Sequence, residues 1–297
     1  SNAASTLAKM GFVERAAEQA EQACRLPQAS GETSPRVMQA RVIWAHRLRD
    51  TGRYTHALAL LEEALGGPEE GASEPDLALA EHRLAQLYQQ LGQPARAVRL
   101  LARERVGLAP GLAMMRLVHR ADAAHALGRG GLSQLRRALT IIDNPDDIYH
   151  RLAGLFATRL VPAEEGEALA TSLAAWASAR ERLGVALAGH VRAAACALAL
   201  GAPQRARPHA EAALHLSIER RPDSFYLPEM WLVAGEVEAA LDRPEAAARH
   251  WRDGAAWVQR TALADVPAEY RDSFLHRNPV NAGLLEKAAR GSAAAGR

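Results

Sequence analysis

The sequence has few cysteines, lysines and aromatic residues, and each shortage excludes a class of protein. Cys24 and Cys196 are its only cysteines and lie far apart, so neither a disulfide framework nor a structural zinc site is expected. The same scarcity predicts a reducing, cytoplasmic location. Lysine occurs only at Lys9 and Lys287, and the net charge is +2. With this small net charge and 5% aromatic residues, the chain is not expected to bind nucleic acid directly.

Long apolar segments and catalytic motifs are missing as well. The apolar stretches 168–179 and 193–203 fall short of the roughly 18 residues of a membrane-spanning helix, and no signal peptide is recognisable. The chain has no P-loop, no G-x-G-x-x-G, no H-E-x-x-H and no G-x-S-x-G. Its eleven histidines do not cluster at metal-ligand spacings. We therefore expect no membrane association, catalytic residue, metal site or cofactor.

What the sequence does contain is a repeat. The segments LGQPARAVRLL (91–101), LGAPQRARPHA (200–210) and LDRPEAAARHW (241–251) share a leucine, then glycine or aspartate, a proline two positions on, and an alanine. The same frame is anchored at Gly11, Gly52, Gly92, Gly128, Gly201 and Asp242, with spacings of 41, 40, 36, 73 and 41 residues. The interval of 73 is about twice the period, and LVPAEEG (160–166) predicts the intervening turn near residue 162.

A period of this length is typical of helix, tight turn, helix. A glycine at the turn adopts the left-handed conformation that ends one helix, and proline fits the first turn of the next helix, where no N–H is needed. An alanine five residues after the anchor lets the two helices approach closely. The sequence therefore predicts an all-α, right-handed superhelical solenoid of about six to seven hairpins, followed by a C-terminal capping helix.

The best repeat is EMWLVAGEVEAALDRPEAAARHW (229–251), with Trp231 at an aromatic position of its first helix and Ala234–Gly235 as a small close-packing pair. VIWAHRLRDTGRYTHALALLEEAL (42–65) and HRLAQLYQQLGQPARAVRLL (82–101) follow the same pattern. Through these residues the sequence resembles the tetratricopeptide repeat family over roughly residues 8–260, although the repeats around 114–185 are degenerate. The resemblance implies hairpins whose first helices line a concave inner face.

The predicted boundaries are a tag remnant at 1–3 (SNA), a repeat array at 4–264 and a capping helix with a frayed tail at 265–297. Residues 4–10 are too few for a full first helix, so the array is expected to begin in mid-repeat. Together with the missing initial methionine, this favours a C-terminal fragment of a larger protein. The alternative is a native start that has lost its methionine.

The tail segment VPAEYRDSFLHRNPVN (266–281) is the least repetitive part of the chain. Asp265 is expected to cap a helix whose apolar stripe, Val266, Tyr270 and Phe274, covers the last repeat. Asn278 and Pro279 are expected to end that helix, and Asn281 to cap a final short one. The segment is therefore interpreted as a cap rather than as a catalytic motif.

Candidate binding residues are those that the repeat frame places on the inner face. They are polar in the early repeats and mixed with apolar residues later, which suits a peptide or a small ligand. Solvated helix faces are the alternative interpretation. The candidates are Gln39, His46, Arg49, His82, Gln86, Gln89, Asp122, His125, Glu229 and Glu236. Phe225 and Tyr226 lie in a connector and are candidates either for a lid over the groove or for local packing.

The array and its tail also resemble the C-terminal regions of large bacterial signalling proteins, including multidomain transcriptional regulators with a STAND-type ATPase and the maltose-regulator-like activators. This resemblance implies a non-enzymatic domain that senses a protein, a peptide or a small inducer. A stand-alone scaffold or adaptor is the second hypothesis, and an enzyme on a helical scaffold is the third. The oligomeric state is left open.

Overall fold

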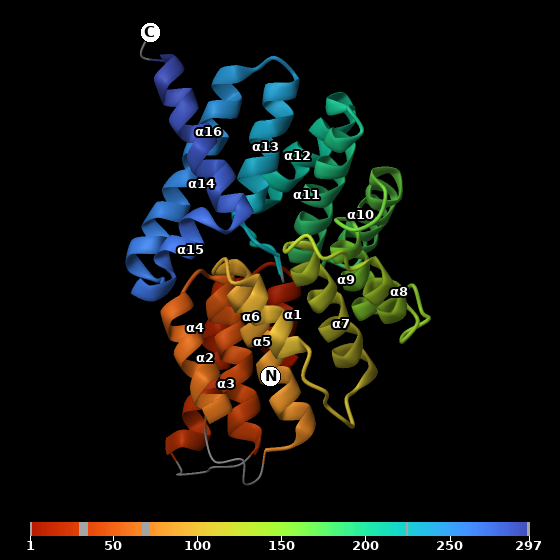
Figure 1. Cartoon of the computed structure of the whole chain (residues 1–297), viewed down its shortest axis with the longest axis vertical. Coiled ribbons are helices and arrows are strands. Elements are labelled where there is room, and N and C mark those ends of the chain that lie inside the picture. The colour runs from red at the N-terminus through yellow and green to blue at the C-terminus, as the bar shows by residue number, and fades with distance from the viewer. Residues whose placement is uncertain (1, 30–34, 67–71, 224, 296–297) are drawn as a thin grey trace.

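The computed structural model describes residues 2–29, 35–66, 72–223 and 225–295. Within these ranges the chain forms sixteen α-helices and one short 3-10 helix and contains no strand, in agreement with the expected all-α solenoid (Figure 1). None of these helices is both long and apolar enough to cross a bilayer.

Consecutive helices pair into hairpins. The first four are α1 (Asn2–Lys9) with α2 (Val13–Ala29), α3 (Pro35–Asp50) with α4 (Tyr54–Gly66), α5 (Glu74–Gln90) with α6 (Pro94–Leu101), and α7 (Pro110–His125) with α8 (Leu132–Leu139). The next three are α9 (Ile148–Ala157) with α10 (Ala163–Ser178), α11 (Leu183–Ala199) with α12 (Pro203–Ser217), and α13 (Pro228–Ala240) with α14 (Pro244–Ala264). The tail adds η1 (Ala268–Tyr270), α15 (Arg271–His276) and α16 (Pro279–Ala295). Helix α1 has only eight residues and packs against α2. It includes Asn2 and Ala3.

The turns within the hairpins have the geometry that the repeat frame indicated. All six anchor residues have a positive φ, between 57° at Asp242 and 90° at Gly11. The turn between α9 and α10 is different, because Pro162 at the helix N-cap has a φ of −53°. A further left-handed residue, Glu181 with a φ of 55°, joins α10 to α11 and was not expected from the repeat.

Small residues allow the paired helices to pack closely. Ala57, Ala97, Ala206 and Ala247 are each 0% exposed, and they occupy the same place in their hairpins. Larger apolar side chains fill two main clusters, one formed by α9–α13 together with Met115 of α7 and one that combines α3–α5 with the C-terminal helices. This second cluster joins the two ends of the array, so the solenoid is closed rather than open.

The closure places C-terminal elements against the turns of the first three hairpins (Figure 1). The connector between α12 and α13 covers the first turn, the end of α14 covers the second, and the tail covers the third. The backbone contacts are Arg221 N–H to Gly11 O (2.9 Å) and Thr55 N–H to Asp265 O (2.7 Å). Side-chain contacts run from Ser273 Oγ to Leu91 O (2.6 Å) and from Asn278 Nδ2 to Gln90 O (2.8 Å).

Arg96 makes further contacts with the tail. Its guanidinium lies over the rings of Tyr88 and Tyr270, with centroid distances of 5.5 and 5.4 Å. It also donates a hydrogen bond to the Tyr270 hydroxyl at 2.6 Å. Cation–π and hydrogen-bond contacts therefore act together where the tail meets α5 and α6.

The tail differs in detail from the expected cap. Asp265 ends α14 instead of starting a helix, and Pro267 precedes the short η1. The cap of α16 is Asn278, whose Oδ1 accepts from Val280 N–H at 3.0 Å, and not Asn281. The expectation was wrong because Asn278 followed by Pro279 also fits a helix start, where the missing proline N–H costs nothing.

The two parts of the tail cover different surfaces. Helix α16 packs on α13 and α14 and so covers the last hairpin, a place that was expected for the preceding segment. The preceding segment instead places Phe274, which is fully buried, against Tyr54 of α4. The apolar residues of the tail therefore join the C-terminal end of the array to its early hairpins, in addition to covering the last hairpin.

Two glycines of nearly equal backbone geometry allow this closure to be tested. Gly92 and Gly201 have φ values of 72° and 67°. A Cβ at Gly201 would meet nothing within 4 Å, whereas one at Gly92 would overlap the carbonyl of Ser273 in the tail. We expect Gly201→Ala to cost ~1–2 kcal/mol of unfolding free energy through its left-handed backbone. Gly92→Ala should cost more, because the tail must also move. Urea denaturation compares them, and equal losses would contradict a stabilising tail contact.

Candidate functional site

The inner side of the closed array carries a partly open cavity of about 500 Å³. The first helices of several hairpins form one wall of it, and the connector before α13 and the start of α16 form the other. Its lining residues are Arg49, Gln86, Gln89, Gln90, Gly92, Pro94, His119, Asp122, His125, Ala126, Phe156, Arg159, Phe225, Tyr226, Glu229, Arg277, Asn278, Pro279 and Val280. The cavity is thus built jointly by the N-terminal and C-terminal halves of the chain.

Helical spacing explains how α5 and α7 present their polar side chains together. Gln86 and Gln89 are three residues apart, as are His119 and Asp122, and residues at this spacing share one face of a helix. Gln89 Nε2 lies 3.3 Å from Asp122 Oδ2, which joins the two helices across this face. The polar side chains of the two helices are therefore hydrogen-bonded to each other on this face.

Most of the residues expected on the inner face do meet at this cavity. They are Arg49, Gln86, Gln89, Asp122, His125, Glu229, Phe225 and Tyr226. Phe225 belongs to the buried core, and the Tyr226 hydroxyl donates to Asn281 Oδ1 at 2.7 Å. These two rings form a fixed part of the wall.

Four expected residues lie elsewhere. Gln39 donates to Asp76 Oδ1 at 2.6 Å, and Glu236 faces Lys287 of α16 at 3.5 Å. His46 is only 2% exposed, and its ring lies close to Asp50 and to Asp223 of the α12–α13 connector. His82 faces a smaller neighbouring cavity. The repeat frame placed them on the inner face, but it could not show which parts of that face other segments cover.

Several lining residues were not expected from the sequence. His119 lies one helical turn before Asp122, so the spacing rule could have found it. Arg159 lies in the degenerate turn between α9 and α10, where the repeat gives no reliable frame. Residues 277–280 come from the tail, and no local pattern indicates that the chain returns to the inner face.

A network of ion pairs crosses the cavity wall near Glu229. Arg159 pairs with both Asp122 and Glu229, and Arg192 NH1 lies 2.6 Å from Glu229 Oε1. Arg192 also donates to Thr158 Oγ1 at 2.9 Å. Burial alone would raise the pKa of Glu229, but the charges and hydrogen bonds of the two arginines outweigh it and hold the pKa below its ordinary value. Glu229 is therefore a buried, ionised carboxylate.

The other wall carries neutral histidines. Burial, reinforced by nearby arginines, lowers the pKa of His119 well below its ordinary value. Gln86 Oε1 accepts from Arg49 and Arg83, so its amide nitrogen donates to His119 Nε2 at 2.7 Å. This arrangement places the imidazole proton on Nδ1. The pKa of His46 and that of His82 are likewise lowered, chiefly by burial.

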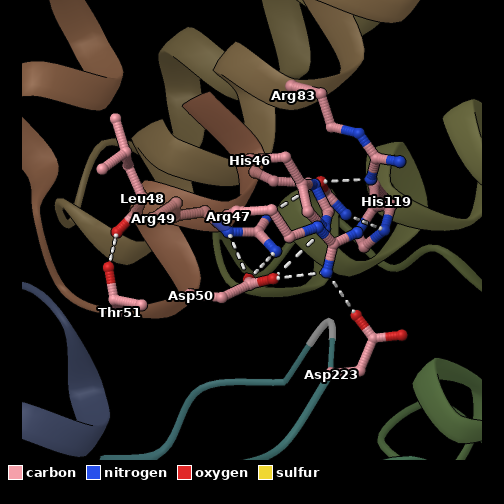
Figure 2. Close-up of polar contacts among 10 residues, drawn as sticks. His46, Arg47, Leu48, Arg49, Asp50, Thr51, Arg83, His119 and Asp223 are labelled. Carbon is pink, nitrogen blue, oxygen red and sulfur yellow. Dashed lines mark hydrogen bonds and ion pairs between the residues drawn. The ribbon is translucent and has the colours of Figure 1, made fainter. Parts of the chain in front are cut away.

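The cluster around Asp50 is an ion-pair network rather than a metal site (Figure 2). Ligand atoms of His46, Asp50 and Asp223 lie within 4.8 Å of one another, which is close enough for a shared cation. However, Arg47 pairs with both carboxylates, at 3.0 Å to Asp50 and 2.9 Å to Asp223, and Arg49 pairs with Asp50 at 2.6 Å. A cation there would face two guanidinium groups, which disfavours its binding.

Comparison with known proteins defines the class of the fold. No protein-family model and no curated protein matches the sequence. Solved structures do match, including a tetratricopeptide repeat protein from Parabacteroides merdae ATCC 43184, with 15% identity, 93% of this chain and 96% of that chain covered, and a TM-score of 0.46. Another is a Rap protein complexed with Competence and Sporulation Factor, with 13% identity, 86% and 76% covered, and a TM-score of 0.50.

At these identities the likeness concerns the fold alone. Together with the paired helices and their left-handed turns, it defines the chain as a tetratricopeptide-like helical repeat protein. The expectation of this repeat fold is thereby confirmed.

Proposed function

We propose that this chain is a non-enzymatic binding domain that takes a small charged molecule or a short peptide in its central cavity. The observation that carries the proposal is the cavity of about 500 Å³, a size within the ordinary range for ligand sites. A Rap protein of similar fold has been solved in complex with Competence and Sporulation Factor, which supports a binding role for a chain of this fold.

The charges of the lining indicate the kind of ligand. Asp122 and Glu229 supply carboxylates, and Arg49, Arg159 and Arg277 supply guanidinium groups, of which Arg159 already pairs with both carboxylates. Phe156 and Phe225 add apolar surface between them. A ligand with both a cationic and an anionic group, such as an amino acid or a short peptide, complements this distribution.

Ligand binding would act on the closure of the array. Because both halves of the chain line the cavity, a ligand that contacts both stabilises the closed arrangement by mass action. In a multidomain bacterial transcriptional regulator of the cytoplasm, such a change would bias attached output domains. The resemblance of the tail and the repeats to the C-terminal regions of such regulators supports this role.

A substitution that fills the cavity tests the proposal. Ala126 lines the cavity and has an exposed side chain, so Ala126→Trp adds bulk without removing a core contact. Amino acids and short peptides are screened by thermal shift, and hits are measured by calorimetry. A hit at a hundredfold excess over its Kd should stabilise the native chain by about 2.7 kcal/mol. We expect Ala126→Trp to abolish this stabilisation.

The matched control is Ala240→Trp, at an exposed position at the other end of α13 from Glu229. It adds the same side chain and should leave ligand binding unchanged. If Ala126→Trp bound the hits as well as the native chain does, the ligand would lie outside the cavity. If no compound stabilised the native chain, the proposed class of ligand would be wrong.

A further inference from the structure

A second, smaller cavity of about 120 Å³ lies beside the central one. It is enclosed by the end of α1, the inner sides of α3 and α5, the starts of α7 and α9, and the α12–α13 connector. The polar side chains that define it are Lys9, Arg47, His82, Arg83, Gln86 and Asp223. Gln86 lines both cavities and separates them.

The charges around this small cavity do not balance. Arg47 and Arg49 are matched by the carboxylates of Asp50 and Asp223, with which they form ion pairs (Figure 2). Arg83 donates to Gln86 Oε1 at 3.0 Å, which is a neutral acceptor. Lys9 adds another cation at the cavity wall. Among the residues that line this cavity, Lys9, Arg47 and Arg83 are cationic and Asp223 is anionic, so two positive charges remain.

Burial and the repulsion between these cations lower the pKa values of Lys9 and Arg83. Burial, followed by the charges of Arg49 and Arg47, lowers the pKa of Arg83 to about 9. Burial also lowers the pKa of Lys9, and Arg182 and Arg47 act in the same direction. Asp223 acts against the shift of both pKa values. An added anion would relieve this repulsion in the same way.

We propose that this small cavity binds a phosphate group. At neutral pH a phosphate carries a charge near −1.5 to −2, which neutralises the excess of two positive charges, whereas a carboxylate would neutralise only one. The planar guanidinium of Arg83 offers parallel donors to two phosphate oxygens, and Lys9 contributes a point charge. The small volume selects a compact oxyanion or the phosphoryl end of a larger molecule.

The scarcity of lysine gives the proposal a direct test. Lys9 and Lys287 are the only lysines, so acetylation of each can be followed separately by mass spectrometry of peptides. Inorganic phosphate at millimolar concentration should slow the acetylation of Lys9 and leave that of Lys287 unchanged. This readout uses the native chain and does not depend on any substitution. Unchanged modification of Lys9 in the presence of phosphate would overturn the proposal.

Calorimetry with variants provides the second arm. Lys9→Met and Arg83→Gln should each weaken the binding of inorganic phosphate by roughly tenfold or more, the amount expected for a hydrogen bond to a charged group. The controls are Lys287→Met on α16 and Arg136→Gln at an exposed position of α8, and both should bind phosphate as the native chain does. Equal affinity of Lys9→Met, Arg83→Gln and the native chain would count decisively against the site.

Comparison of probes identifies the source of the phosphate. Stronger protection of Lys9 by phosphoserine than by inorganic phosphate would show that the site takes the phosphoryl end of a larger molecule. Protection by inorganic phosphate alone would show a site for the free anion. Equal protection by acetate at the same ionic strength would contradict the preference for a doubly charged oxyanion. Because the probes and residues differ from those of the central cavity, failure here would leave the proposed function unaffected.

Discussion

Glu229→Ala is expected to lower the free energy of unfolding by about 3–5 kcal/mol, the usual cost of removing one partner from a buried ion pair. Glu229 is 5% exposed and is paired with both Arg159 and Arg192. Without its carboxylate, two guanidinium groups would face each other in a partly desolvated wall. Urea denaturation measures the loss, and circular dichroism checks that the variant remains helical.

The matched control is Glu211→Ala. Glu211 pairs with Arg207 on an exposed face of α12, where its side chain is 55% exposed. An exposed pair of this kind contributes about 0.3–0.5 kcal/mol, so the control should unfold almost as the native chain does. Similar losses for the two variants would mean that burial of the Glu229 network does not contribute to stability.

The pH dependence of the Glu229 effect follows from the direction of its shifted pKa. The folded-state pKa lies below the ordinary value, so the stabilisation is present above the unfolded pKa and is lost as pH falls through the folded one. The difference between Glu229→Ala and the native chain should therefore shrink below about pH 4.3. This behaviour separates the loss of a charge from the loss of packing.

Phe274→Ala is the second substitution with a large expected effect, also about 3–5 kcal/mol. Phe274 is 0% exposed, and its ring centroid lies 5.5 Å from that of Tyr54 across the closure. Its removal leaves a cavity between the tail and the second hairpin. The melting temperature and the urea midpoint should both fall, and the amide proton of Thr55, bonded to Asp265 O, should exchange faster.

Leu275→Ala serves as the control for Phe274→Ala. Leu275 is the next residue of α15 and is only half-buried, so its truncation should cost much less. An unchanged melting temperature for Phe274→Ala would refute a stabilising role of the tail. A large loss without faster exchange at Thr55 would show that the tail stabilises the last hairpin but not the closure.

The sequence predicted the repeat well because its signals are local. A left-handed turn residue favours glycine whatever surrounds it, as at Gly52 and Gly201, and a following proline such as Pro203 fits a helix start. The same local frame placed Gln86 and Gln89 on the inner face. Turn chemistry and helical period act within a few residues, so they can be recognised without knowledge of the fold.

The closure and the cavity could not be predicted in this way, because they depend on contacts between distant residues. Ser273 meets the carbonyl of Leu91 across 182 positions of sequence, and no local pattern marks either residue for the other. His46 was expected on an open inner face, but it is buried close to Asp223 of the α12–α13 connector, a residue far away in the sequence. Arg159 was missed because its hairpin lacks a glycine turn.

The glycine turns of the first three hairpins also fix the size of the molecule. In an open solenoid each hairpin contacts only its neighbours, so repeats can be gained or lost during evolution without loss of the fold. Here Gly11, Gly52 and Gly92 are each covered by a particular C-terminal element. Deleting one internal hairpin would displace that element by roughly the 8–10 Å between packed helices, and the contacts would be lost. The number of repeats is therefore part of the specification of this fold, as the number of strands is in a closed barrel.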